Sequence, residues 1–162
     1  MRGGRGQPQK INLKHVAVTW FFTIFTINIL YFISIYTNSE LIMAPFGATC
    51  VLIFGATESP LAQPRNVIGG HLIAATISVL LGQWLGDSWW VLALGVATAI
   101  SVMQLTKTLH PPAGADPLVI ITSHASWNFI FVPVLLGAVV LVTCAVLTNN
   151  FIKNRHYPQF WW

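Results

Sequence analysis

Residues 16–36 read VAVTWFFTIFTINILYFISIY, a run without a single charged side chain. A helix of this length measures about 31 Å at 1.5 Å per residue, which matches the hydrocarbon thickness of a bilayer. The rest of the chain has the same character, since 55% of its 162 residues are hydrophobic and only 7% are charged. A soluble domain averages about 25% charged residues. The sequence therefore predicts an integral membrane protein, with the lipid bilayer as its first partner.

Outside this run, three more apolar stretches are long enough to be membrane spans: residues 67–86, 89–105 and 129–148. Two shorter apolar segments, residues 41–57 and 109–123, carry Pro and Gly near their starts, where regular helix is disfavoured. We therefore expect an all-α membrane protein with four long transmembrane helices and two short, Pro/Gly-broken, membrane-embedded helices. The expected organisation is a disordered basic N-terminus, a transmembrane domain and a basic, aromatic tail: residues 1–14, 15–152 and 153–162.

The two short segments share a pattern that recurs at a fixed offset along the chain. APFGAT, residues 44–49, aligns with PPAGAD, residues 111–116, and each lies between two long spans. This predicts a twofold repeat with halves near 15–87 and 88–152. If the short segments cross the membrane, all eight Lys and Arg residues lie on one side, as the positive-inside rule favours; if they are re-entrant, only six do. Crossing makes the repeat inverted and both termini cytoplasmic.

Helices that are broken inside a membrane need partners for their free backbone groups in protein or water. We expect short helices that start after Gly47 and Gly114, and such N-termini carry partial positive charge that suits a small anion. In inverted-repeat transporters, helix ends of this kind form the substrate site. The predicted substrate-binding residues are Gly47, Ala48, Thr49, Arg65, Asn66, His71, Lys107, His110, Gly114 and Ala115. The predicted structural residues are Pro45, Pro111, Pro112 and Asp116, the last as an N-cap.

These residues also have plainer interpretations. Pro and Gly can make tight turns between packed helices, and Arg65 and Lys107 can anchor the chain at the membrane interface. His110 can either bond local carbonyls or hold a transferable proton, because imidazole titrates near neutral pH. His71 follows two glycines and is a functional candidate because ionisable groups are rare inside membranes.

Other chemistries find little support in the sequence. The five histidines show neither an i, i+4 pair nor an HExxH motif, so we expect no metal. No nucleophile motif or phosphate-binding loop occurs, so we expect no enzyme and no cofactor. The net charge of +4 is not accompanied by a basic face interleaved with aromatic residues, so nucleic acid is not an expected partner. Cys50 and Cys144 lie in apolar runs and are interpreted as buried thiols.

Three motifs resemble those of the HPP family of integral membrane proteins, which is named for His-Pro-Pro. They are LTKTLHPPAGADPLV (105–119), SPLAQPRNVIGGHLI (59–73) and PFGATCVLIFGA (45–56), within a resemblance that covers roughly residues 15–158. The family is described as having four transmembrane helices, and members from cyanobacteria and chloroplast envelopes are associated with nitrite transport. The resemblance therefore implies nitrite transport in nitrogen assimilation, in a cyanobacterial-type plasma membrane. Asp116-Pro117 is a departure, since many relatives are expected to have small or hydroxyl residues there.

The resulting hypothesis is a transporter of a small monovalent anion, most simply nitrite, that assembles as a homo-oligomer. Nitrate, formate and bicarbonate remain alternative substrates. Three alternatives to a carrier stay open: an anion channel, a non-transporting structural or regulatory module, and an intramembrane enzyme that uses His110 or His71.

Overall fold

The computed structural model describes residues 12–153 and 155–161, and this part of the chain is helical with short connections. The α-helices are α1 (Leu13–Thr37), α2 (Ala44–Cys50), α3 (Pro64–Leu85), α4 (Trp89–Leu105), α5 (Asp116–Thr122) and α6 (Leu136–Asn150). The π-helical segments are η1 (Val51–Gly55) and η4 (Ile130–Leu135), and the 3-10 segments are η2 (Pro60–Ala62) and η3 (Pro111–Ala115). Most of the N-terminal segment predicted as disordered, residues 1–11, lies outside the described residues.

The membrane character is confirmed, but the count of four long spans is not supported. Among the described residues, three helices are long and apolar enough to cross a membrane: α1, α3 and the continuous η4–α6 segment, with 25, 22 and 21 residues. Helix α4 has only 17 residues. Left-handed backbone lies close to both of its ends, at Gly86 (φ 80°) and Lys107 (φ 57°), and limits its length.

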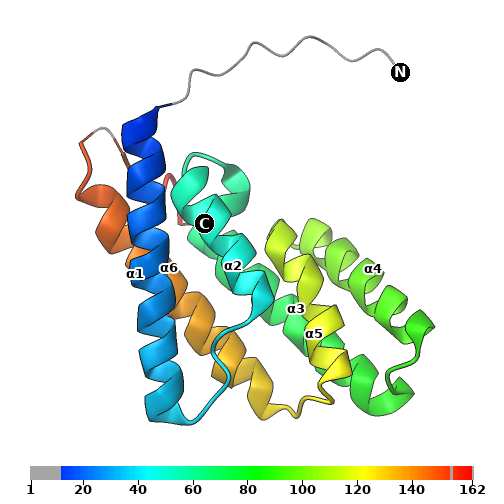
Figure 1. The fold of residues 1–162 in the computed structure, drawn as a ribbon. Coiled ribbons are helices and arrows are strands. Elements are labelled where there is room, and N and C mark those ends of the chain that lie inside the picture. The colour runs from blue at the N-terminus through cyan, green and yellow to red at the C-terminus, as the bar shows by residue number, and fades with distance from the viewer. Residues whose placement is uncertain (1–11, 154, 162) are drawn as a thin grey trace.

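Successive helical segments run alternately between the two ends of the molecule, as the colour order in Figure 1 shows. Contacts between neighbouring ends confirm this path, since His15 near the start of α1 lies 3.4 Å from the carbonyl of Gly55 at the end of η1. Figure 1 shows the start of α1, the start of α3, the end of α4 and the end of α6 at one end of the bundle, and the basic residues of the described chain lie in or shortly after these helix ends in sequence: Lys14, Arg65, Lys107, Lys153 and Arg155. These direction changes are the ones that the six-crossing alternative requires, while the repeat itself stays a prediction.

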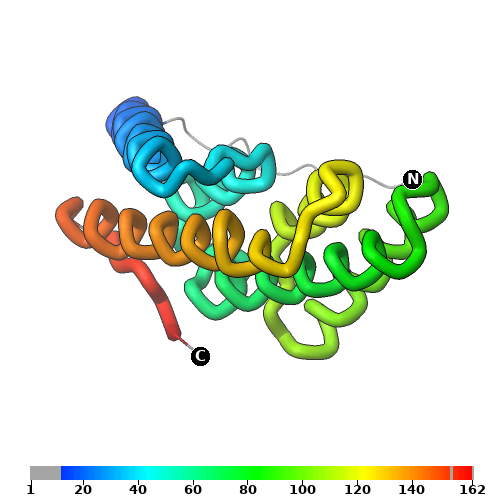
Figure 2. Tube along the Cα trace, turned by 90° about the horizontal axis from the view of Figure 1, so that it is seen from below, coloured from blue at the N-terminus to red at the C-terminus, as the bar shows by residue number. Residues whose placement is uncertain are grey.

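Helix α3 is the centre of the bundle. It packs against α4 and α5 on one side and against η4 and α6 on another. Helix α1 lies at the edge, where it contacts η1 and α6 (Figure 2). It exposes large apolar side chains along its length, including Trp20, Phe21, Phe25 and Phe32. Exposure of so much apolar surface to water is unfavourable, and contact with lipid chains removes it from water.

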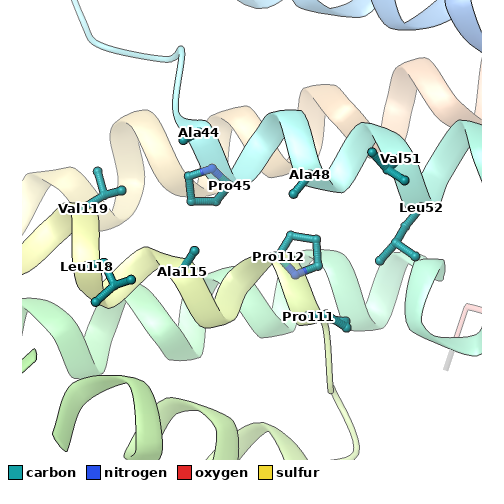
Figure 3. Close-up of a pocket in the computed structure, with 10 residues that line it drawn as sticks. All are labelled: Ala44, Pro45, Ala48, Val51, Leu52, Pro111, Pro112, Ala115, Leu118 and Val119. Carbon is teal, nitrogen blue, oxygen red and sulfur yellow. The ribbon is translucent and has the colours of Figure 1, made fainter. Parts of the chain in front are cut away.

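The two short segments, α2–η1 and η3–α5, lie side by side and run in opposite directions (Figure 3). Their first turns contain Pro45 and Pro111-Pro112, where a missing backbone N–H is tolerated because these N–H groups have no helical partner. The expected helix starts after Gly47 and Gly114 are therefore wrong, because the helical turns begin at Ala44 and Pro111. The two N-termini also lie at opposite ends of the pair and do not face one another (Figure 3).

Candidate functional site

A chain of buried polar side chains lies where the two short segments meet α3. Four side chains in it have no exposed surface: Thr49 of α2, His71 of α3, His110 just before η3, and Asp116 of α5. The Thr49 Oγ1 atom lies 3.0 Å from His71 Nε2 and 2.9 Å from His110 Nε2. His71 Nδ1 lies 2.8 Å from Asp116 Oδ2, and His110 Nδ1 lies 2.8 Å from the carbonyl oxygen of Leu61. We call these four side chains the His71 centre.

Close packing against α3 places His110 in this centre. A Cβ atom at Gly70 would lie 2.8 Å from His110 Cβ and 3.1 Å from the Thr108 carbonyl, so only glycine allows the approach. Asn66, one turn earlier on α3, donates to the Leu109 carbonyl at 2.9 Å. The backbone around His110 is therefore held by the N-terminal half of α3.

The hydrogen bonds of the His71 centre define where protons can reside. A carbonyl only accepts, so His110 Nδ1 donates to Leu61 and the Nε2 atom of a neutral His110 is bare. Thr49 has one hydroxyl hydrogen and three acceptors within reach: His71 Nε2, His110 Nε2 and the Pro45 carbonyl at 3.1 Å. One added proton on His71 lets Nε2 donate to Thr49, which can then donate to His110. The four side chains therefore form one continuous hydrogen-bonded chain.

Asp116 does not act as the N-cap that the sequence suggested. It is the first residue of α5, and the cap position, Ala115, makes no side-chain hydrogen bond. Its carboxylate pairs with His71 instead, while its Oδ1 atom has no hydrogen-bond partner among the described residues. A buried carboxylate needs a charge or several donors to be stable, so the state of His71 decides the charge balance of the whole centre.

An aromatic side chain closes the centre on the side of α6. The ring of Phe46 meets His71 edge-on, with centroids 5.2 Å apart, and His71 meets His110 at 5.1 Å. Gly137 of α6 lies directly against Phe46, because a Cβ atom there would overlap the ring. Glycine at this position therefore lets α6 press Phe46 onto His71.

The opposite face of the two short segments borders an open apolar cavity of about 650 Å³ (Figure 3). Its walls contain neither a charged side chain nor a side-chain hydrogen-bond donor: Ala44, Pro45, Ala48, Val51, Leu52, Pro111, Pro112, Ala115, Leu118 and Val119. Ala48 and Ala115 line the cavity, whereas the next residues, Thr49 and Asp116, belong to the His71 centre. The short segments thus form a thin wall between an apolar cavity and a buried polar centre.

The structure separates the predicted site residues into three groups. The first group comprises Thr49, His71, His110 and Asp116, which form the His71 centre, and the second comprises the Pro and Ala residues that line the cavity. Arg65 and Lys107 lie outside both, at the end of the bundle, where Arg65 donates to the Thr106 carbonyl at 2.9 Å. Gly47 has open space beside it, and Gly114 faces Ile100 at 3.8 Å.

Sequence reasoning missed several contributors to this site. Leu61 contributes its backbone carbonyl, Phe46 its ring, and Gly137 the space left by its missing side chain. None of the three has a polar side chain that would mark it in the sequence. Sequence analysis also treated Thr49, His71 and Asp116 as separate candidates. The alignment of the two short segments pairs Thr49 with Asp116, and that pairing was the available signal that both face one partner. Among the described residues, no group of three or more His, Cys, Asp or Glu side chains could hold a metal ion.

Comparisons with known proteins agree on a membrane family. Residues 8–158 match the family described as HPP, transmembrane region. A transmembrane protein of Dictyostelium discoideum is 35% identical over 173 residues, covering 99% of this chain and 56% of that protein. A second Dictyostelium transmembrane protein is 34% identical over 168 residues, covering 96% of this chain and 59% of that protein. No solved structure matches.

These relatives refine the expectations. This chain spans a little over half the length of the curated relatives it matches. Both relatives come from Dictyostelium, so the comparisons do not support the bacterial plasma membrane implied by the resemblance. Because the family match covers nearly the whole chain and the apolar helices agree with it, this protein belongs to the HPP family of integral membrane proteins.

Proposed function

We propose that this protein transports a small inorganic anion, nitrite being the first candidate, together with a proton bound at the His71 centre. The observation that carries the proposal is the fully buried hydrogen-bonded chain of Asp116, His71, Thr49 and His110. Ionisable groups are rare inside membranes and mark ion or proton pathways there. This chain lies between two broken helical segments, the arrangement that transporters use for substrate and ion sites.

The apolar cavity favours the passage of an uncharged species over that of a bare anion. A charge in an apolar environment is disfavoured by many kcal/mol unless it is paired. Nitrite and one proton together form nitrous acid, which carries no net charge. The cavity walls are formed by Ala, Pro, Val and Leu side chains, and the residues that follow Ala48 and Ala115 belong to the His71 centre. Such a cavity suits nitrous acid. The proposal places proton exchange at His71 and substrate passage along the cavity.

In this proposal the two short segments belong to inverted halves, and the end of the bundle with the basic residues faces the cytoplasm. The antiparallel course of α2–η1 and η3–α5 supports this arrangement. The chain functions as a homo-oligomer in which a second copy covers apolar surface beside the cavity. Exposed Val51 and Leu118 on its rim support this part of the proposal.

A flux assay in proteoliposomes tests the proposal. Nitrite, nitrate, formate and bicarbonate are offered at pH 7.5–8.5, where little nitrous acid exists to leak through lipid, and empty liposomes measure the leak. We expect saturable nitrite uptake that an inward proton gradient accelerates and that acidifies the lumen by one proton per nitrite. Counterflow of labelled substrate separates a carrier from a channel.

Three variants complete the assay. Asp116→Asn and His110→Ala should abolish the response to the proton gradient, whereas His124→Ala should leave it unchanged, because His124 lies on the surface beside Asp87. If an anion is transported but the proton gradient changes its flux in neither the natural chain nor the variants, proton coupling is refuted. No protein-dependent flux of any of the four anions would refute transport itself.

A non-transporting module is the second candidate, and the open cavity is the observation that favours it. An apolar groove of this volume can also accept a helix from another membrane protein. That role predicts no flux from the purified protein and a stable complex whose formation is blocked by enlarging Ala48 or Ala115.

A further inference from the structure

A second polar site lies at the end of the bundle where α1 begins and α6 ends, far along the chain from the His71 centre. A pocket of about 330 Å³ is lined there by Asn12, Lys14, His15, Val18, Ile152, Lys153 and Arg155. An adjoining pocket of about 370 Å³ shares His15 and Arg155 with it. None of these residues takes part in the proposed transport chemistry.

Arg155 is held in place by side chains from both neighbouring helices. Its Nη1 atom donates to Asn149 Oδ1 at 3.1 Å, and its Nη2 atom donates to His15 Nδ1 at 2.6 Å. Asn149 is itself fixed, because its Nδ2 atom donates to the carbonyls of Ile53 and Ala145. Guanidinium only donates, so the imidazole of His15 is the acceptor; its Nε2 atom also lies 3.0 Å from Arg155 Nη2 and 3.4 Å from the Gly55 carbonyl oxygen.

The charge of this pocket is not balanced by its own walls. Lys14, Lys153 and Arg155 are basic, and no carboxylate lines this pocket; Glu58 lines the adjoining pocket but forms no ion pair with Arg155. The ion pairs found among the described residues, His71–Asp116 and His124–Asp87, lie elsewhere. Partial burial lowers the pKa of Arg155, because removal from water disfavours its charged form. Such a preorganised, uncompensated group is a strong binder of oxyanions.

The location selects the kind of oxyanion. Lys14 lies in the first turn of a membrane-spanning helix, and Lys153 lies just beyond the end of another. This level of the bundle is where a bilayer places its phosphate groups, and basic pockets between helices bind anionic headgroups there. Val18 and Ile152 give the pocket apolar walls beside the cations, against which the upper part of a lipid chain can pack.

We propose that this pocket binds the phosphate of an anionic lipid headgroup, with Arg155 as its fixed contact and Lys14 and Lys153 as flexible ones. The bound lipid fastens the start of α1 to the segment after α6, because these three residues come from the two ends of the chain. The site is independent of the transport proposal and stands or falls separately from it.

Native mass spectrometry of the full chain in detergent tests the site with phosphatidylglycerol, phosphatidylcholine and inorganic phosphate as probes. We expect phosphatidylglycerol to bind at least tenfold more tightly than phosphatidylcholine. The double variant Lys14→Gln/Lys153→Gln should weaken phosphatidylglycerol binding about 20- to 30-fold, since each surface cation contributes about fivefold. Arg155→Gln should abolish the preference, and thermal unfolding checks that this variant stays folded.

Lys107→Gln is the matched control, because Lys107 is an exposed cation at the same end of the bundle but outside the pocket. It should change phosphatidylglycerol binding by less than twofold. Equal binding of the two lipids by the natural chain, or equal losses in Lys107→Gln and the double variant, would overturn the site. Inorganic phosphate that binds as tightly as phosphatidylglycerol and displaces it would overturn the lipid as the ligand.

Discussion

The two short helical segments carry different groups at the same repeat position, and His71 lies between them. Thr49 of α2 contacts Nε2 of the imidazole, and Asp116, the corresponding residue of the second segment, contacts Nδ1. On the opposite face all the lining residues of both segments are apolar, and two aligned pairs are identical: Pro45 with Pro112 and Ala48 with Ala115. The cavity wall is therefore alike in both segments, whereas the buried centre is not.

In the predicted repeat, this difference gives the two aligned segments distinct roles beside His71. A hydroxyl both donates and accepts and carries no charge, while a carboxylate accepts and holds a charge. With one of each on either side of His71, the two nitrogens of the ring are no longer equivalent. The asymmetry of the His71 centre is thus set by the aligned pair of Thr49 and Asp116.

The largest expected effect comes from removing the group that both segments share. His71→Leu leaves the Asp116 carboxylate buried without a partner, which should lower the free energy of unfolding by about 3–5 kcal/mol. The double variant His71→Leu/Asp116→Leu should recover most of that loss, because no charge remains to be paired. Thermal unfolding in detergent measures both. Equal destabilisation in the single and double variants would show that the pair is not an energetic unit.

The next effect concerns Gly70 and Gly137, which are related by the same offset as the two short segments. Gly70→Ala would force apart His110 and the Thr108 carbonyl and should cost about 2–3 kcal/mol of stability. Gly137→Ala would strike the ring of Phe46 and should disturb His71 as well. Gly47→Ala is the control, because it has open space and gains helix propensity. Unfolding midpoints for the three variants test whether close approach, rather than helix flexibility, requires the first two glycines.

Exchange of the two corresponding groups sharpens the comparison further. Thr49→Val removes the only hydroxyl hydrogen between the two imidazoles and should cost about 1–2 kcal/mol, because it leaves buried acceptors without a donor. Asp116→Thr removes the charge but keeps a hydroxyl. The exchange variant Thr49→Asp/Asp116→Thr should be more stable than Thr49→Asp alone, since one carboxylate again faces one imidazole. Unfolding in a double-mutant cycle measures this coupling, and additive effects would contradict it.

The smallest expected effect lies in a contact between the segment after α6 and η2. Tyr157, in the segment after α6, donates to the Ala62 carbonyl at 2.7 Å, and its burial raises the pKa of the phenol above its ordinary value of 10.0. The contact should therefore be fully present below pH 10 and be lost as the pH rises through the higher folded-state pKa. Tyr157→Phe should remove this pH dependence at a cost of about 1 kcal/mol. A pH series of unfolding midpoints for both proteins checks the sign.

The sequence predicted the membrane setting and most helix positions, because long uncharged runs and Pro-Gly breaks are local signals. Residues 89–105, for example, were predicted to the residue as α4. It also identified His71, His110 and Thr49 as site candidates. The starts of the short helices were misplaced because Pro45 and Pro111 were treated as breaks, whereas proline in a first turn begins a helix.

The partners of the site residues could not be derived from local sequence. The bond from His71 to Asp116 spans 45 residues, and the one from Thr49 to His110 spans 61. The packing of η3 and α5 against α3, and of α2 against η3 and α6, brings these groups together. The role of Asp116 was therefore predicted from its neighbours in the chain, as an N-cap, while its neighbour in space is an imidazole.

The end of η1 has a mechanical consequence. The Ile53, Phe54 and Gly55 carbonyls there are bound by Asn149, Thr19 and His15, which come from α6 and α1. The other end of the same segment, at Met43, has no side-chain cap. Packing holds that first turn instead, because Phe46 lies between Gly137 of α6 and the ring of His71. Any displacement of the first turn of α2 would therefore move Phe46 against His71, which couples the wall of the apolar cavity mechanically to the buried His71 centre.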